Sequence, residues 1–338
     1  MDSWKSIVAG LFANVAEGRP MELLVELSKT KLQPAPLTRL IPEPTLNGQT
    51  QSFDGTSIYW EVHGPKPTSD GPRPILFCYG LACSMNQWRA QLERYSPHRP
   101  CILFDYRGHH GSAFPEDPSR FNISALARDA AAVLHHLELT QEVHVFGHSL
   151  GVNVALELAA SEPELCRSLI LCCGTADNPF RSMFGTDKIE KVMTPILAAY
   201  PDKADYFDLA WRLMQARPGA TALGARFLGF NMDASSLKDV ETYAQSVASI
   251  DPQTFFFLLR DLSRGMTRGI LPKIRVPTLA IAGRLDRVTP PESMKLIADA
   301  LPNAFYVEIP AGSHNVQLDF GEYVALKAEE FWKNRKLD

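Results

Sequence analysis

The chain has 338 residues, of which 45% are hydrophobic and 21% charged, and its formal net charge at pH 7 is −4. A chain of this length can bury one large hydrophobic core or two modest ones. The slight negative charge excludes the basic surface that nucleic-acid binding requires, and no run of about 18 apolar residues predicts a membrane-spanning helix.

The cysteines favour a reducing compartment. Several lie in apolar runs, and the sequence has no Cys-x-x-Cys pair and no Cys/His metal-ligand spacing. The expected state is free, buried thiols, so the expected location is the cytoplasm. A signal peptide over Ser6 to Ala16 is disfavoured, because Asp2 offsets the charge of Lys5 and no small-residue cleavage site follows. The six are Cys78, Cys83, Cys101, Cys166, Cys172 and Cys173.

Residues 1–48 are predicted to form an N-terminal helical extension and a proline-containing connector. Two short helices are expected before about residue 31, separated by Gly18-Arg19-Pro20. The first, from Trp4 to Val15, has apolar residues at helical spacing along one face. That face is expected to pack against the rest of the chain or to form a homo-oligomer contact, and a mobile tail is the alternative.

Residues 49–174 and 276–338 carry the pattern of an α/β domain. A hairpin is expected over Gln49 to His63, with its turn at Asp54-Gly55. Short apolar runs then alternate with helical stretches over Ile123 to Leu137 and Leu150 to Ala160. This order predicts a mostly parallel sheet covered by helices on both faces. The predicted strands are Ile75 to Cys78, Cys101 to Phe104, Val143 to Phe146, Leu169 to Cys173, Leu279 to Ala282 and Phe305 to Ile309.

Residues 175–275 interrupt this order with helical patterns alone. Asp251-Pro252 is a typical helix start, a capping side chain followed by proline in the first turn. About a hundred residues are too many for a simple connection, so they predict a helical cap over the sheet. The three phenylalanines from Phe255 to Phe257 span over half of a helix circumference, and part of that surface is expected to face the sheet above the site.

The segment Gly147-His148-Ser149-Leu150-Gly151 is a G-x-S-x-G pattern. It lies between a predicted strand and a predicted helix, the context in which a serine is presented on a sharp turn as a nucleophile. The glycines allow close approach of neighbouring chain, and the helix N-terminus directs free N–H groups at the site. Ser149 is therefore the candidate nucleophile.

A serine needs a base, and the expected chain order is serine, acid, histidine. His314 fits, because it lies in Ala311-Gly312-Ser313-His314 just after a predicted strand. Asp286, after the strand that ends at Ala282, is the candidate that orients this base. Asp177, which follows the preceding strand, is the alternative acid.

A tetrahedral intermediate would need two preorganised N–H donors for its oxyanion. The backbone N–H of Leu150, directly after the serine, is one candidate. The other is the N–H of Leu81, in the loop Tyr79-Gly80-Leu81 that follows an early strand. These roles demand no metal and no organic cofactor.

On these motifs the chain resembles the α/β-hydrolase superfamily from about Gln49 to the C-terminus. Three positions depart from the family pattern: Tyr79 replaces a usual histidine, and Val152 and His110 each replace a usual glycine. A serine at the elbow argues against the haloalkane dehalogenases and epoxide hydrolases, which use aspartate there. The motifs are Tyr79-Gly80-Leu81, Asp105-Tyr106-Arg107-Gly108, the serine elbow, Gly283-Arg284-Leu285-Asp286 and Gly312-Ser313-His314.

The resemblance implies a serine hydrolase that acts through an acyl-enzyme on an ester or lactone. The large apolar side chains of the predicted cap favour an apolar substrate of small to medium size. C–C bond hydrolases and cofactor-free perhydrolases use the same parts on this fold and are alternatives. A non-catalytic ligand receptor that retains the pocket is a further alternative, although every part of the expected triad is present.

Overall fold

The computed structural model describes residues 37–139, 141–205, 207–208, 211, 229–231 and 233–338. The helix predicted from Trp4 to Val15 lies outside these residues, so its apolar face and its oligomer contact stay predictions. The cap residues Tyr206 and Phe227 also lie outside them.

The centre of the molecule is an eight-stranded sheet with the order β1-β2-β4-β3-β5-β6-β7-β8. The pairs β1–β2 and β2–β4 are antiparallel, and every other neighbouring pair is parallel. This confirms the mostly parallel sheet. The strands are β1 Leu46–Gln51, β2 Ser57–His63, β3 Ile75–Cys78, β4 Cys101–Phe104, β5 Val143–His148, β6 Cys166–Cys172, β7 Thr278–Gly283 and β8 Ala304–Ile309.

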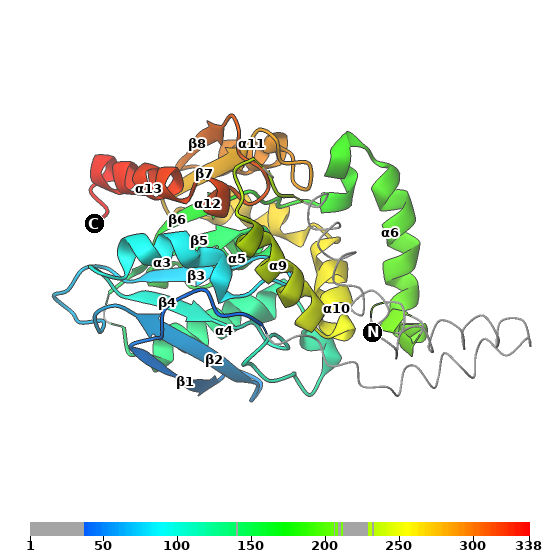
Figure 1. Ribbon diagram of the computed structural model, residues 1–338, viewed down its shortest axis with the longest axis horizontal. Helices are drawn as coiled ribbons and strands as arrows, with labels where there is room; N and C mark the ends of the chain where they lie inside the picture. Colours follow the sequence, from blue (N-terminus) through cyan, green and yellow to red (C-terminus); the bar gives the residue numbers. More distant parts are fainter. Residues whose placement is uncertain (1–36, 140, 206, 209–210, 212–228, 232) are drawn as a thin grey trace, which may run out of the picture.

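Two groups of helices cover the sheet (Figure 1). One consists of α3 Arg89–Tyr95, α12 Val316–Asp319 and α13 Gly321–Arg335; the other contains α4 Ile123–His136, α5 Leu150–Ser161 and α11 Pro291–Ala300. Their inner surfaces are strongly apolar. Trp332 of α13, for example, stacks on His144 of β5 with ring centroids 4.2 Å apart.

The central strands are buried along their whole length, as their continuous apolar runs predict. All six cysteines are buried and free, which confirms the expectation for the thiols. Some strand boundaries were wrong. Strand β5 continues to His148, and β6 begins at Cys166 and ends at Cys172, because Cys173 adopts a positive φ of 49° and turns the chain out of the strand.

The predicted hairpin is confirmed. It begins slightly earlier than expected, at Leu46, and β1 pairs with β2 in the register Leu46 to Val62. Its turn contains Gly55 at a φ of 80°, a conformation that glycine adopts without steric cost. Across the turn, the Ser52 N–H donates to the carbonyl of Thr56 at 2.9 Å.

Between β6 and β7, the described residues form helices and turns and no strand. The main helices are α6 Lys188–Ala199, α9 Leu237–Ser249 and α10 Pro252–Leu262, which lie to the right of the sheet in Figure 1. Helix α10 begins as its sequence predicts: the Asp251 side chain accepts from the N–H of Gln253, and Pro252 occupies the first turn.

The aromatic side chains of α10 pack against rings of both the insertion and the core. Phe256 stacks on Tyr200 with centroids 4.5 Å apart, and Phe255 contacts Trp211 at 4.6 Å, so both contribute to the packing of the insertion itself. Phe257 reaches the core, where it stacks on Phe121 at 6.3 Å. That part of this surface faces the sheet above Ser149 stays a prediction.

A buried charge cluster fixes the turn after β4. The Arg107 guanidinium is fully buried and binds both oxygens of Asp129 in α4, at 2.6 and 2.8 Å. It also binds Asp54 in the hairpin turn at 2.7 Å. One side chain therefore joins the hairpin, the β4 turn and α4.

Replacing Arg107 should test this cluster. Arg107→Met leaves Asp129 buried without its partner, so we expect the free energy of unfolding to fall by about 3–5 kcal/mol, measured by urea denaturation. The control is Arg120→Met, since Arg120 pairs with Asp117 at the surface and should cost less than about 1 kcal/mol. Equal losses for the two variants would contradict the assignment.

Candidate active site

Ser149 lies on the sharp turn between β5 and α5, at φ 53° and ψ −117°. The flanking glycines make this turn sterically accessible. A Cβ at Gly151 would lie 2.0 Å from the carbonyl oxygen of Cys78, and one at Gly147 would lie 2.5 Å from the carbonyl oxygen of Gly151. The N–H of Ser149 donates to the carbonyl groups at the end of β6, which holds the turn against the sheet.

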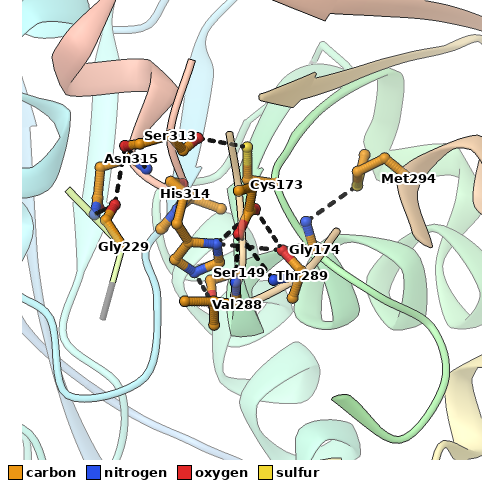
Figure 2. A network of polar contacts seen from close by, with 12 residues as sticks. Ser149, Cys173, Gly174, Gly229, Val288, Thr289, Met294, Ser313, His314 and Asn315 are labelled. Carbon is orange, nitrogen blue, oxygen red and sulfur yellow. Dashed lines mark hydrogen bonds and ion pairs between the residues drawn. The ribbon is translucent and has the colours of Figure 1, made fainter. Parts of the chain in front are cut away.

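His314 contacts both Ser149 and Asp286, and Figure 2 shows its ring beside Ser149 and Thr289. Its Nε2 is 3.1 Å from the Ser149 Oγ, and its Nδ1 is 2.8 Å from the Asp286 Oδ2. The structure thus brings together three residues that are separated by 165 and 28 positions in the chain. In this geometry the imidazole can accept the serine proton while the carboxylate binds its opposite N–H.

Asp286 is almost completely buried, with 3% of its surface exposed. Burial alone would raise its pKa, but His314 and hydrogen bonds from Thr289 together hold the pKa of this carboxyl below its ordinary value. The N–H groups of Val288 and Thr289 donate to its Oδ1, and the Thr289 hydroxyl donates to its Oδ2 at 2.8 Å. Thr289 was not predicted, although a threonine three residues after an aspartate is a recognisable signal for such a turn.

Asp177 lies elsewhere and has another partner. Its carboxylate binds the Arg268 guanidinium at 2.6 Å. Of the two acids considered from the sequence, Asp286 is the one that contacts His314.

The loop after β3 lies against Ser149. A Cβ built on Gly80 would come within 3.2 Å of the Ser149 Cβ. In the described part of the chain, the N–H groups of Leu81 and Leu150 donate to no protein acceptor, whereas the Gly80 N–H is bound to the Gln87 side chain. Both N–H groups named from the sequence are therefore free of a described protein acceptor, as their predicted role requires.

His148 has a role that the sequence did not indicate. Its ring lies inside the fold as expected, and its Nε2 is 2.7 Å from the carbonyl oxygen of His314. Burial and the neighbouring His314 lower the pKa of His148 to about 3, so the ring is neutral near pH 7. A neutral ring bound to a carbonyl must carry its proton on Nε2.

The insertion between β6 and β7 touches each of the loops around Ser149. The carbonyl of Gly229 accepts from the Ser313 hydroxyl and the Asn315 amide, both at 2.9 Å (Figure 2). From α9, the Ser246 hydroxyl donates to the carbonyl of Ala82 at 2.9 Å. From α10, the Thr254 hydroxyl donates to the carbonyl of Gly108 at 3.4 Å.

Two departures from the superfamily pattern have structural uses at this site. The Tyr79 hydroxyl donates to Asp105 and accepts from the N–H of Tyr106, which joins the β3 and β4 loops. His110 adopts a positive φ of 38°, and its Nε2 lies 2.9 Å from the carbonyl oxygen of Cys83. Both side chains join neighbouring loops.

A serine at a strand–helix turn, beside a His–Asp pair on a mostly parallel sheet, defines the class of α/β hydrolases. The family model described as "alpha/beta hydrolase fold" matches residues 73–320, and the chain belongs to this family. The description of this family, and the names of similar proteins, support hydrolase activity.

Among the curated relatives is "Putative carbamate hydrolase RutD" of Azorhizobium caulinodans, 30% identical over 260 residues that span 76% of this chain and 88% of the relative. Two solved structures share the fold with TM-scores of 0.68. An esterase from Thermogutta terrifontis is 22% identical and covers 87% of this chain and 99% of its own. An enol-lactonase from Burkholderia xenovorans is 19% identical and covers 85% of this chain and all of its own.

Two further properties concern the described residues alone. None of their helices is both long enough and apolar enough to cross a membrane. Their His, Cys, Asp and Glu side chains form no cluster of three or more that could hold a metal ion.

The neutral state of His148 predicts a pH dependence of stability. In the unfolded chain a histidine titrates near about pH 6.5, whereas folding lowers the pKa of His148 to about 3. Between these two pKa values the unfolded chain binds the proton and the folded chain does not. The free energy of unfolding therefore falls as the pH is lowered below about 6.5, by up to about 1.4 kcal/mol per pH unit.

His148→Gln, which keeps an N–H donor for the His314 carbonyl, should make the fall in unfolding free energy between about pH 6 and 4 shallower by roughly that amount. Urea denaturation at several pH values measures it. The same slope in both proteins would contradict a neutral, buried His148.

Proposed function

We propose that the protein is a serine hydrolase that cleaves an apolar carboxylic ester or lactone through an acyl-enzyme. The observation that carries the proposal is the single imidazole of His314, which lies within hydrogen-bonding distance of both Ser149 and Asp286. Ser149 is assigned as nucleophile, His314 as base and Asp286 as the residue that orients and stabilises the base.

The proposed reaction begins when the Ser149 Oγ attacks the substrate carbonyl carbon and its proton passes to the Nε2 of His314. The carbonyl oxygen becomes an oxyanion, which the N–H groups of Leu81 and Leu150 bind. The carbon–oxygen bond to the leaving alcohol then breaks, and His314 gives its proton to that alcohol. Water repeats the sequence on the acyl-enzyme, releasing the acid and restoring the serine.

The helical insertion at residues 175–275 is proposed to act as a cap on the hydrolase core of residues 49–174 and 276–338. Support comes from its hydrogen bonds to the loops around Ser149, through Gly229, Ser246 and Thr254. Such a cap would shield the acyl-enzyme from bulk water and shape the substrate site.

The ester or lactone class is supported by fold neighbours that include an esterase and an enol-lactonase. A carbamate is a second candidate, because the relative that aligns over most of its length is named for carbamate hydrolysis. A panel of p-nitrophenyl esters, lactones and p-nitrophenyl carbamates compares these classes directly. The free, buried thiols support a cytoplasmic location.

C–C bond hydrolysis and perhydrolysis would use the same three residues, so product analysis must separate them from ester hydrolysis. A non-catalytic receptor would bind ligand without turnover. Covalent labelling by a fluorophosphonate probe would contradict a purely ligand-binding function, because only an activated serine displaces fluoride from the probe.

Ser149→Ala should abolish both labelling and ester turnover while the unfolding temperature stays nearly unchanged, because a serine hydroxyl on a turn contributes little to stability. His314→Ala should lose a similar factor, since these residues act as a unit. Initial rates on p-nitrophenyl butyrate and mass spectrometry of the labelled peptide provide the measurement. Substantial turnover in either variant would overturn the assignment.

Asp286→Asn should lower kcat by about 10⁴, because an amide favours the wrong tautomer of His314. The matched control is Asp177→Asn, which removes an ion pair with Arg268 and should change kcat by less than about threefold. An exchange of the two outcomes would place the functional acid after β6.

A further inference from the structure

The side-chain amide of Gln87 lies between the two loops that hold the free N–H of Leu81 and the imidazole of His314. Gln87 is part of the short helix η1 Met85–Trp88 and has 5% of its surface exposed. Its Oε1 accepts from the N–H of Gly80 at 2.8 Å, and its Nε2 is 3.3 Å from the Oδ1 of Asn315. A buried amide with both ends engaged has few alternative orientations.

The contact with Gly80 fixes the direction of the β3 loop. The peptide group between Tyr79 and Gly80 is held on both sides: its carbonyl accepts from the Tyr106 hydroxyl at 2.8 Å, and its N–H donates to Gln87. The next peptide group, between Gly80 and Leu81, has its carbonyl bound by the N–H of Cys83 at 3.1 Å. Its own N–H, on Leu81, is left free and can rotate little.

The contact with Asn315 has a defined polarity. The Gly80 N–H is a donor and must face the Gln87 oxygen, so the Gln87 NH₂ faces Asn315. Asn315 then presents its oxygen to Gln87 and its NH₂ to the carbonyl of Gly229, at 2.9 Å. The Gly80 N–H donor at one end and the Gly229 carbonyl acceptor at the other determine which way each side-chain amide points, so each amide has one favourable orientation. The chain of contacts connects the Leu81 loop, the residue after His314 and the insertion.

We propose that Gln87 is a positioning residue for oxyanion stabilisation. Its side-chain oxygen accepts from the N–H of Gly80, which sets the orientation of the N–H of Leu81. Through Asn315 it also fixes this loop relative to the loop of His314. The inference rests on the proposed function and adds a residue that contacts none of the reacting atoms. Its effect should appear in binding of the transition state, because donors must lie within tenths of an ångström of the developing oxyanion.

The test substitutes Gln87→Met, which keeps the side-chain length and removes both polar ends. We expect kcat on p-nitrophenyl butyrate to fall by about 10- to 100-fold and KM to change by less than about threefold. Affinity for an aliphatic trifluoromethyl ketone, which adds reversibly to the serine and forms an oxyanion, should fall by the same factor as kcat/KM. Gln87→Asn, one methylene too short to span both partners, should show the same parallel loss and carries the test if Gln87→Met does not fold.

The matched control is Gln91→Met, four residues later. Gln91 is fully buried and its amide donates to the carbonyl groups of Gln317 and Gly321, away from the β3 loop. It should lower the unfolding temperature as much as Gln87→Met and leave kcat and ketone affinity within about twofold of wild type. A purely structural role for Gln87 predicts the same pattern for both variants.

The inference is overturned if Gln87→Met and Gln87→Asn retain wild-type kcat, or if kcat falls while ketone affinity is unchanged. These outcomes differ from failure of the proposed function. In that case the wild-type protein itself would be inactive towards esters and unlabelled by fluorophosphonate at Ser149, and both proposals would fall together.

Discussion

The backbone of Ser149 is the constraint around which the rest of the site is arranged. A non-glycine residue at φ 53° and ψ −117° is strained, by about 1–3 kcal/mol, and persists only where its surroundings determine it. Here α5 begins directly after the serine and passes so close to β3 that a Cβ on Gly151 would lie 2.0 Å from the carbonyl oxygen of Cys78. The strain is offset by the burial of α5 against the sheet, so the orientation of the serine hydroxyl and the free N–H of Leu150 follow from the same close packing.

The other parts of the site are held mainly by backbone groups. The carbonyl of His314 is bound by His148, and the carbonyl of Gly229 is bound by Ser313 and Asn315. Each loop is thereby fixed by a neighbour from a different part of the chain, and the hydroxyl-to-imidazole distance of 3.1 Å needs no rearrangement to support proton transfer. A site built in this way is preorganised for charge that develops during the reaction.

The sequence predicted what depends on local pattern. Apolar runs located the strands, and the glycines around Ser149 located the turn, because both signals lie within a few residues of the feature they specify. It did not predict what depends on packing between distant segments. The amide contacts of Gln87 span 228 positions to Asn315, and the Phe257 ring stacks on Phe121, which is distant in the sequence. The end of β6 was misplaced because Cys173 is apolar like its neighbours, and no local signal marks its positive φ.

The point at which the helical insertion enters the fold has an evolutionary consequence. It leaves the carboxyl end of β6 and returns to the amino end of β7, and because these two strands are parallel its ends lie at opposite edges of the sheet. All of its described helices lie outside the hydrogen-bonded strands. A different set of helices could be exchanged at these two points while the serine, histidine and acid stay in place. At His314 such an exchange would have to reproduce a close backbone approach, because a Cβ at Gly229 would lie 2.7 Å from the Cβ of His314. It would also have to replace the hydrogen bonds that Ser246 and Thr254 make to the loops after β3 and β4. Selectivity for new substrates could therefore diversify through the insertion, within the limits set by these few contacts.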